Sequence, residues 1–132
     1  MSENNYDEEV PAIKDGTAER LVPSRWRSTF CNIVNAFVSG DYLLVNGVPN
    51  VEVISEKTAA HIQSYIREYG ATLTSLSKET WNSSVCIWTG THWDVLVDLY
   101  TEEEGPSDLV LSAQVIDTNP GFQIAVYMVY VP

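Results

Sequence analysis

The chain changes its hydrophobic spacing between Gly70 and Ser84. Before Gly70, apolar residues recur at intervals of three and four, which places them on one side of an α-helix. After Ser84, apolar and polar residues alternate, as is typical of β-strands with one buried face. The pattern therefore predicts helices in the first half of the chain and a β-sheet in the second.

Two helices are predicted. The first spans about residues 24–40, where Gly40 can end it in a left-handed cap. Its apolar stripe consists of Trp26, Phe30, Ile33 and Phe37. The second helix spans about residues 56–69, with Ser55 as its N-cap. Between them, turn signals favour a small hairpin within residues 41–54.

A β-hairpin is predicted around Gly90-Thr91, because glycine at the first position of a two-residue turn favours type II′ geometry. Such a turn fixes the register and sets Trp88 opposite Trp93. Both tryptophans then belong to the core face of the hairpin. Asp94 and Asp98 belong to the other face, which is expected to be hydrated because buried carboxylates are unfavourable.

Other segments complete the predicted sheet. Residues 71–76 alternate as a short strand, and residues 77–82 connect this strand to the hairpin. Two further strands are predicted at residues 108–116 and 122–131. The last strand is expected to alternate without interruption, which places Tyr127 on its polar face. Its apolar face is predicted to consist of Phe122, Ile124, Val126, Met128 and Tyr130.

The predicted fold class is α+β, an antiparallel β-meander of about four to five strands with two α-helices packed on one face. Residues 1–18 are polar and acidic, and they are predicted to form a flexible N-terminal arm. Residues 19–132 are predicted to form a single α+β domain. In this arrangement one face of the sheet stays uncovered.

Charge is distributed unevenly along the sequence. Residues 1–78 carry all seven lysines and arginines and have a net charge of −3, whereas residues 79–132 have eight acids, no base and a net charge of −8. The predicted sheet therefore carries charge of one sign. A nucleic-acid or anionic-membrane partner is not expected, since binding phosphate requires a basic patch.

The N-terminal sequence has neither a basic start nor an apolar core, so a secretory signal is not predicted. No apolar run approaches the roughly 20 residues that span a bilayer. A cytoplasmic location is therefore expected. In a reducing compartment, Cys31 and Cys86 are expected to be free thiols.

Catalytic and metal-binding motifs are weak in this sequence. His92, Asp94 and Asp98 share a strand face, but neighbours on one face are separated by about 6.5–7 Å and cannot easily converge on one ion. Cys86 and His92 fall on opposite faces of the hairpin, which argues against a thiol nucleophile with its base. We therefore predict no enzyme, no cofactor and no metal.

Partner-binding residues are predicted on the uncovered sheet face and in the loop that follows the second strand of the hairpin. They are Asp94, Asp98, Tyr100, Glu102, Glu103, Glu104, Asp108 and Tyr127. Gly105-Pro106 is expected to hold the loop clear of the sheet and leave its carboxylates hydrated. Such carboxylates can attract a cationic partner, while tyrosines supply contact area. The alternative interpretation is a solvated loop that keeps the protein soluble.

The segment Trp93–Leu111 and the ending Val126–Pro132 resemble a bacterial family of small acidic proteins of unknown function, with a resemblance that covers roughly Trp26 to Pro132. It implies a bacterial intracellular domain and supplies no catalytic residues. Families of this size and charge are similar in kind to immunity proteins, which neutralise toxins of neighbouring cells.

These observations favour a small acidic binding protein, an immunity-type inhibitor of a basic toxin or another cationic protein partner. Two alternatives stay open. One is a small-ligand-binding or enzymatic domain with a pocket between helices and sheet, which a deep cavity lined by His61, Asp94 or Asp98 would favour. The other is a structural subunit that forms a homodimer through the exposed sheet face.

Overall fold

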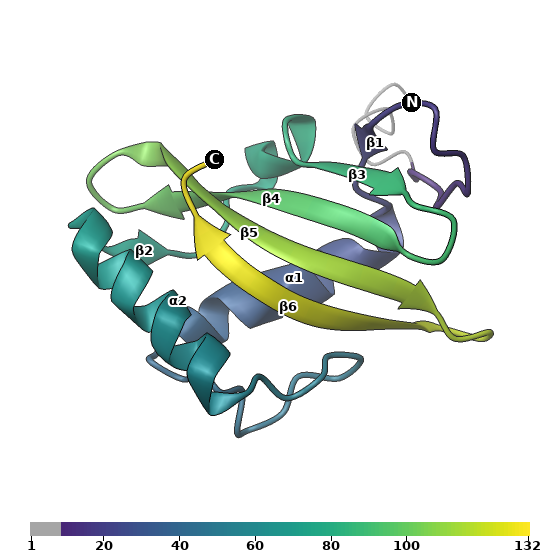
Figure 1. Cartoon of the computed structure of the whole chain (residues 1–132). Coiled ribbons are helices and arrows are strands. Elements are labelled where there is room, and N and C mark those ends of the chain that lie inside the picture. The colour runs from purple at the N-terminus through teal and green to yellow at the C-terminus, as the bar shows by residue number, and fades with distance from the viewer. Residues whose placement is uncertain (1–8) are drawn as a thin grey trace.

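An antiparallel sheet runs through the domain, with one helix across one of its faces and the other helix beside an edge strand (Figure 1). The computed structural model describes residues 9–132. Its elements are β1 (Arg20–Leu21), α1 (Ser24–Val38), α2 (Glu56–Tyr69), β2 (Leu73–Thr74), the 3-10 helix η2 (Lys78–Asn82), β3 (Val85–Trp88), β4 (Trp93–Thr101), β5 (Gly105–Asp117) and β6 (Phe122–Tyr130). The strand order is β1-β3-β4-β5-β6, and β2 pairs with β4. The α+β class, the antiparallel sheet and the two helices are confirmed.

Both helices form where the apolar stripes predict them. The stripe of α1 is buried, with Phe30 and Ile33 fully inaccessible. At the start of α2, the Ser55 hydroxyl accepts a hydrogen bond from the backbone N–H of Thr58. Gly70 ends the helix in the left-handed region with φ of 90°. The bounds of α2 agree with the predicted ones.

The β3–β4 hairpin has the predicted register, in which Trp88 is paired with Trp93. The backbone N–H of Thr89 donates to the carbonyl of His92 across the turn. Trp93 is 3% exposed, whereas Asp94 lies on the exposed side of β4. Gly90 adopts φ of 108°, which only glycine accommodates easily.

Strand β6 departs from the predicted alternation. The pairs on either side of the departure are Ser112–Met128 and Ala113–Val126. Tyr127 is therefore an extra residue in β6, a β-bulge. Beyond it the side chains change faces, so Val129 is buried in the core while Met128 and Tyr130 lie on the other side. The predicted core positions of Met128 and Tyr130 are wrong because a bulge shifts the alternation by one residue.

Two connecting segments also differ from the predictions. Residues 41–54, all of them described, contain no hairpin; instead Val51 forms a single parallel bridge to Ile124 in β6. Residues 78–82 form a 3-10 helix, since the Ser77 hydroxyl accepts a hydrogen bond from the backbone N–H of Glu79. These segments take their shape from capping groups and from contacts with distant strands.

Residues 9–18 lie against the end of the β3–β4 hairpin. The carbonyl of Ile13 accepts a hydrogen bond of 3.0 Å from Nε1 of Trp93. Gly16 packs so closely that a Cβ there would come within 2.6 Å of the Trp88 carbonyl oxygen. Residues ahead of residue 19 are therefore packed against the domain, because they contact Trp88 and Trp93. The rest of the predicted arm, residues 1–8, lies outside the described residues.

Candidate functional site

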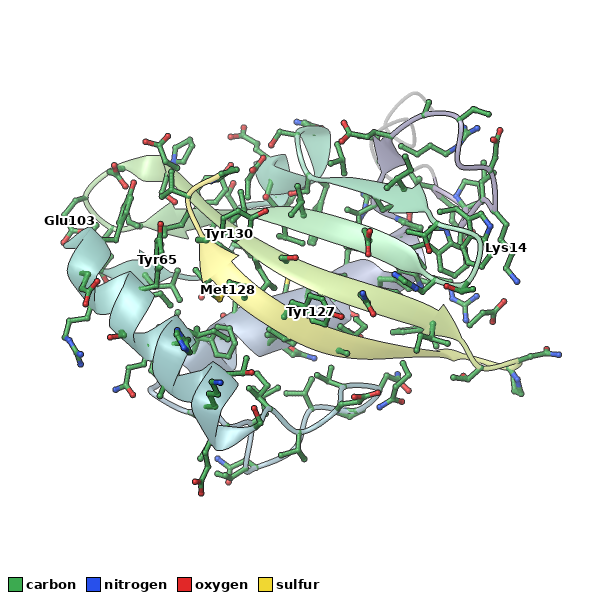
Figure 2. All side chains as sticks on the ribbon, in the orientation of Figure 1. Lys14, Tyr65, Glu103, Tyr127, Met128 and Tyr130 are labelled. Carbon is green, nitrogen blue, oxygen red and sulfur yellow. The ribbon has the colours of Figure 1, made fainter. Side chains whose placement is uncertain are left out.

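The side of the sheet turned away from α1 is uncovered, and we call its residues the open face. In β3 to β6 they are Val85, Ile87, Asp94, Leu96, Asp98, Tyr100, Val110, Ser112, Gln114, Ile116, Gln123, Ala125, Met128 and Tyr130. Figure 2 shows Tyr127, Met128 and Tyr130 along β6, with Tyr65 of α2 beside them. The Tyr65 hydroxyl accepts a hydrogen bond from the backbone N–H of Val131, which ties α2 to the end of β6.

The open face combines acidic and apolar positions. Asp98 is paired with Val110, which is in turn paired with Tyr130 on the next strand. Val110 is only 6% exposed, although it belongs to the uncovered side of the sheet. Tyr127 at the bulge is 58% exposed. The centre of the open face is thus apolar, and carboxylates and phenol rings surround it.

Asp94 and Asp98 differ in their surroundings. The Asp94 carboxylate is exposed and lies 3.0 Å from Nε2 of His92. The Asp98 carboxylate accepts a hydrogen bond from the hydroxyl of Ser83. Its backbone is held as well, since Thr80 donates to the Asp98 carbonyl and the Asp98 N–H donates to Ser84. Asp98 therefore attaches η2 to the edge of β4, a role that the sequence did not indicate.

The loop between β4 and β5 is anchored to the end of α2. The carboxylate of Glu103 accepts hydrogen bonds from the backbone N–H of Thr72 at 2.7 Å and from its hydroxyl at 2.9 Å. The carboxylate of Glu104 accepts from the hydroxyl of Tyr69 at 2.8 Å and from that of Thr101 at 3.0 Å. All three glutamates of the loop are exposed, in keeping with the expectation that they are hydrated, but Glu103 and Glu104 are also bonded to residues at the end of α2.

Neutral donors hold this loop. The Thr72 backbone N–H, followed by the Thr72 hydroxyl, lowers the pKa of Glu103 and keeps it ionised. Glu102 and Asp108, the other predicted acids of the loop region, are exposed. The hydroxyl of Tyr69 also accepts a hydrogen bond from the backbone N–H of Asp108. The loop thus has a fixed position and keeps its negative charge.

Tyr69 and Thr72 hold the acidic loop in place, and the sequence did not reveal this. The nearest carboxylate partner of Tyr69 is 35 residues away, and that of Thr72 is 31 residues away. No local pattern signals such contacts. The other predicted site residue in this region, Tyr100, is half-buried at the junction where β4 pairs with both β2 and β5.

The described residues also form pockets. Of five such pockets, the largest has a volume of about 550 Å³ and lies between residues 39–46 and the first turns of α2. Another, of about 230 Å³, lies beside Tyr127, between β6 and residues 52–55. None of the five is lined by His61, Asp94 or Asp98. None of the five is therefore the cavity that would favour a ligand-binding domain, and that alternative stays a prediction.

Within residues 9–132, no three His, Cys, Asp or Glu side chains are grouped so that they could hold a metal ion. Cys31 and Cys86 are free thiols. Burial raises the pKa of the Cys86 thiol to about 11, so it stays protonated at neutral pH. No helix in the described part of the chain is long and apolar enough to span a membrane.

Residues 34–132 match the model of a domain of unknown function, DUF7668. Because the match covers most of the sequence, the chain belongs to this family. It begins within α1 and includes the whole sheet apart from β1. The predicted membership of a family of unknown function is confirmed. No curated protein and no solved structure matches the chain.

Proposed function

We propose that this DUF7668 protein binds and neutralises a basic protein partner, as an immunity-type inhibitor in a bacterial cytoplasm. One observation carries the proposal. Strands β3 to β6 contain no lysine or arginine, and their open face presents Asp94 and Asp98 together with tyrosines. A surface with acidic and aromatic groups and no base of its own complements a cationic surface.

The anchored loop extends this surface and adds fixed charge. Glu103 and Glu104 accept hydrogen bonds from neutral groups, so no cation within these contacts cancels their charge. A loop that is already ordered loses little conformational entropy when a partner binds. Its field can also steer a basic protein and raise the rate of association by roughly ten-fold or more at low salt.

Tyr127 and two neighbouring side chains of the open face would supply the contact area. Tyr127 is exposed at the bulge, and Met128 and Tyr130 are half-buried beside it. Tyrosine and methionine are enriched in protein interfaces, where an apolar body packs and a polar tip finds a partner. The bulge matters here, since it turns Met128 and Tyr130 toward the open face.

Several of the chain's own bases have partners away from the open face. Arg20 pairs with Asp15 at 3.1 Å. The guanidinium of Arg25 lies 5.3 Å from the ring centroid of Phe122, and that of Arg27 lies 5.4 Å from the ring centroid of Trp81. A cationic partner is therefore the natural source of positive charge for the open face.

Affinity capture from the native host tests the proposal. The bait is the whole chain, beside a variant that carries Asp94→Asn, Glu102→Gln and Asp108→Asn. A matched control carries Glu9→Gln, Glu19→Gln and Glu68→Gln, which removes the same charge from outside the open face and the loop. We expect a basic protein to bind the wild type and the control and to be lost from the first variant, most clearly at low salt.

An activity assay of the captured protein then tests inhibition. Addition of the wild-type chain is expected to abolish the activity of that protein, and the first variant is expected to act only at higher concentration. A captured partner that is acidic, or that binds both variants equally, would contradict the proposal. Binding without any loss of the partner's activity would remove the inhibitor role and leave only the binding role.

A further inference from the structure

Three tryptophans meet at the end of the molecule opposite the anchored loop. The ring centroids of Trp88 and Trp93 are 4.7 Å apart, and those of Trp26 and Trp93 are 5.1 Å apart. Trp26 and Trp93 are buried, whereas Trp88 at the end of β3 is partly exposed. The cluster therefore offers aromatic surface to whatever lies over the hairpin.

A lysine of the same chain occupies this surface. Nζ of Lys14 lies 5.3 Å from the ring centroid of Trp88 and 5.9 Å from that of Trp93. It also lies 3.2 Å from a carboxylate oxygen of Asp117, at the end of β5. Figure 2 shows Lys14 at one end of the molecule and Glu103 at the other. Two aromatic rings and a carboxylate thus surround one ammonium group.

These groups are the ones that proteins use to recognise ammonium ions, because aromatic faces and a carboxylate both attract a cation of this size. The site is also open to exchange. The side chains of Lys14 and Asp117 are 52% and 40% exposed, so water can reach the pair. Beside it lies a cavity of about 150 Å³, which Lys14, Trp26, Trp93 and Asp117 help to line.

The segment that carries Lys14 is attached to the domain by few hydrogen bonds. Among the described residues, Val10 exchanges two with Ser24, the carbonyl of Ile13 accepts one from Trp93, and the carboxylate of Asp15 accepts one from Arg20 of β1. From Glu9 to Glu19 it contains neither helix nor strand. Moving Lys14 out of the site therefore requires no change in the sheet.

We propose that Trp88, Trp93 and Asp117 form an ammonium-binding site that Lys14 fills in cis and that an external lysine-type or methylated ammonium group can occupy in its place. The site is distinct from the open face, so this inference does not depend on the proposed function. Lys14 acts as an internal competitor at a high effective concentration. Its removal is expected to expose the site.

Titration with tetramethylammonium chloride, followed by tryptophan fluorescence against sodium chloride of equal ionic strength, tests the inference. The chains compared are the wild type, Lys14→Ala, Lys14→Gln and the control Lys57→Ala, which removes a lysine from α2. We expect half-saturation of the two Lys14 variants at about ten-fold lower tetramethylammonium than for the wild type and the control, since the two aromatic contacts and the ion pair of Lys14 no longer compete.

A second set of titrations identifies the site and the source of the ammonium group. Adding Asp117→Asn to Lys14→Gln is expected to abolish the response. N-acetyl-lysine amide in place of tetramethylammonium tests whether a lysine side chain fits as well as a methylated amine, and a response to either supports the site. Thermal unfolding of each variant checks that it is folded. Folded Lys14 variants that respond to both ammonium compounds no more than to sodium chloride would overturn the inference.

Discussion

The two ends of β5 treat acidic side chains in opposite ways. At the first end, Glu103 and Glu104 accept hydrogen bonds from a backbone N–H and from hydroxyl groups, none of which carries charge. At the last end, Asp117 pairs with the ammonium group of Lys14 above two tryptophans. The carboxylates are held in place at both ends, but only the carboxylate of Asp117 has its charge neutralised by a cation.

This difference shows that an acidic side chain can be held in place either with or without neutralisation of its charge. Neutral donors fix a carboxylate without cancelling its field, so the loop can be ordered and still attract a cation. An ion pair beside aromatic rings instead leaves little net charge at the surface. The tryptophan end therefore contributes mainly to the fold, and the loop end presents the charge that the proposed partner would meet.

Trp93→Ala should disrupt the packing of the tryptophan cluster and cause the largest loss of stability. Trp93 is 3% exposed and contacts the rings of both Trp26 and Trp88. Truncation of a buried tryptophan typically destabilises a protein by about 3–5 kcal/mol. Urea unfolding should show a loss of this size, and a much smaller loss for Trp93→Phe. A loss below about 1 kcal/mol for Trp93→Ala would show that this end does not support the fold.

Thr80→Val should cause the next largest loss of stability. Thr80 contacts β4 at Asp98, between the two ends of the molecule. Thr80 is fully buried, and its hydroxyl donates to the carbonyl of Asp98 and contacts the hydroxyl of Ser84. Loss of that donor leaves the partly buried Asp98 carbonyl without this hydrogen bond, which destabilises by about 1–3 kcal/mol.

Ser83→Ala serves as the comparison for Thr80→Val. It removes the exposed hydrogen bond to the Asp98 carboxylate and a longer one, of 3.4 Å, to the Thr80 carbonyl, and it is expected to destabilise less. Urea unfolding of both variants measures the difference. Equal effects would mean that the carboxylate contact matters as much as the buried one.

Glu103→Gln should cause the smallest loss of stability, and the size of that loss should depend on pH. The pKa of Glu103 is lowered from 4.5 by the Thr72 backbone N–H and hydroxyl. Its contribution to stability is therefore complete above the pKa of the unfolded chain and is lost as the pH falls through the lower folded pKa.

Thermal unfolding at about pH 7 and about pH 3 measures this dependence. The wild type is expected to unfold at a higher temperature than Glu103→Gln at neutral pH, and the two should converge in acid as the carboxylate is protonated. A difference that is equal at both pH values would show that the hydrogen bonds do not favour the ionised form of Glu103.

Local patterns were sufficient to predict much of the fold. The apolar stripes and Ser55 located α2 because capping and helical spacing act within one turn. Gly90-Thr91 fixed the pairing of Trp88 with Trp93, since a two-residue turn leaves a single register. The open face of β4, with Asp94, followed from that register.

The candidate site was less predictable, because its distinguishing contacts join distant parts of the chain. The sequence indicated that Glu103 and Glu104 are acidic, but Thr72 and Tyr69 lie more than 30 residues away. The bulge at Tyr127 was missed because one inserted residue leaves no trace in composition. In the sequence, Lys14 belongs to a polar segment that was predicted to be a flexible arm. Its contacts with the rings of Trp88 and Trp93 become visible only in the folded structure.

The near-surface electrostatic potential at individual amide protons tests the central claim most directly. It can be measured by NMR from the relaxation caused by cationic and anionic paramagnetic cosolutes. The potential is predicted to be more negative at Glu102, Glu103 and Glu104 than at Thr118 and Asn119, next to Asp117. Lys14→Gln should make only the second group more negative. Equal potentials at the two ends of β5 in the wild type would contradict the account.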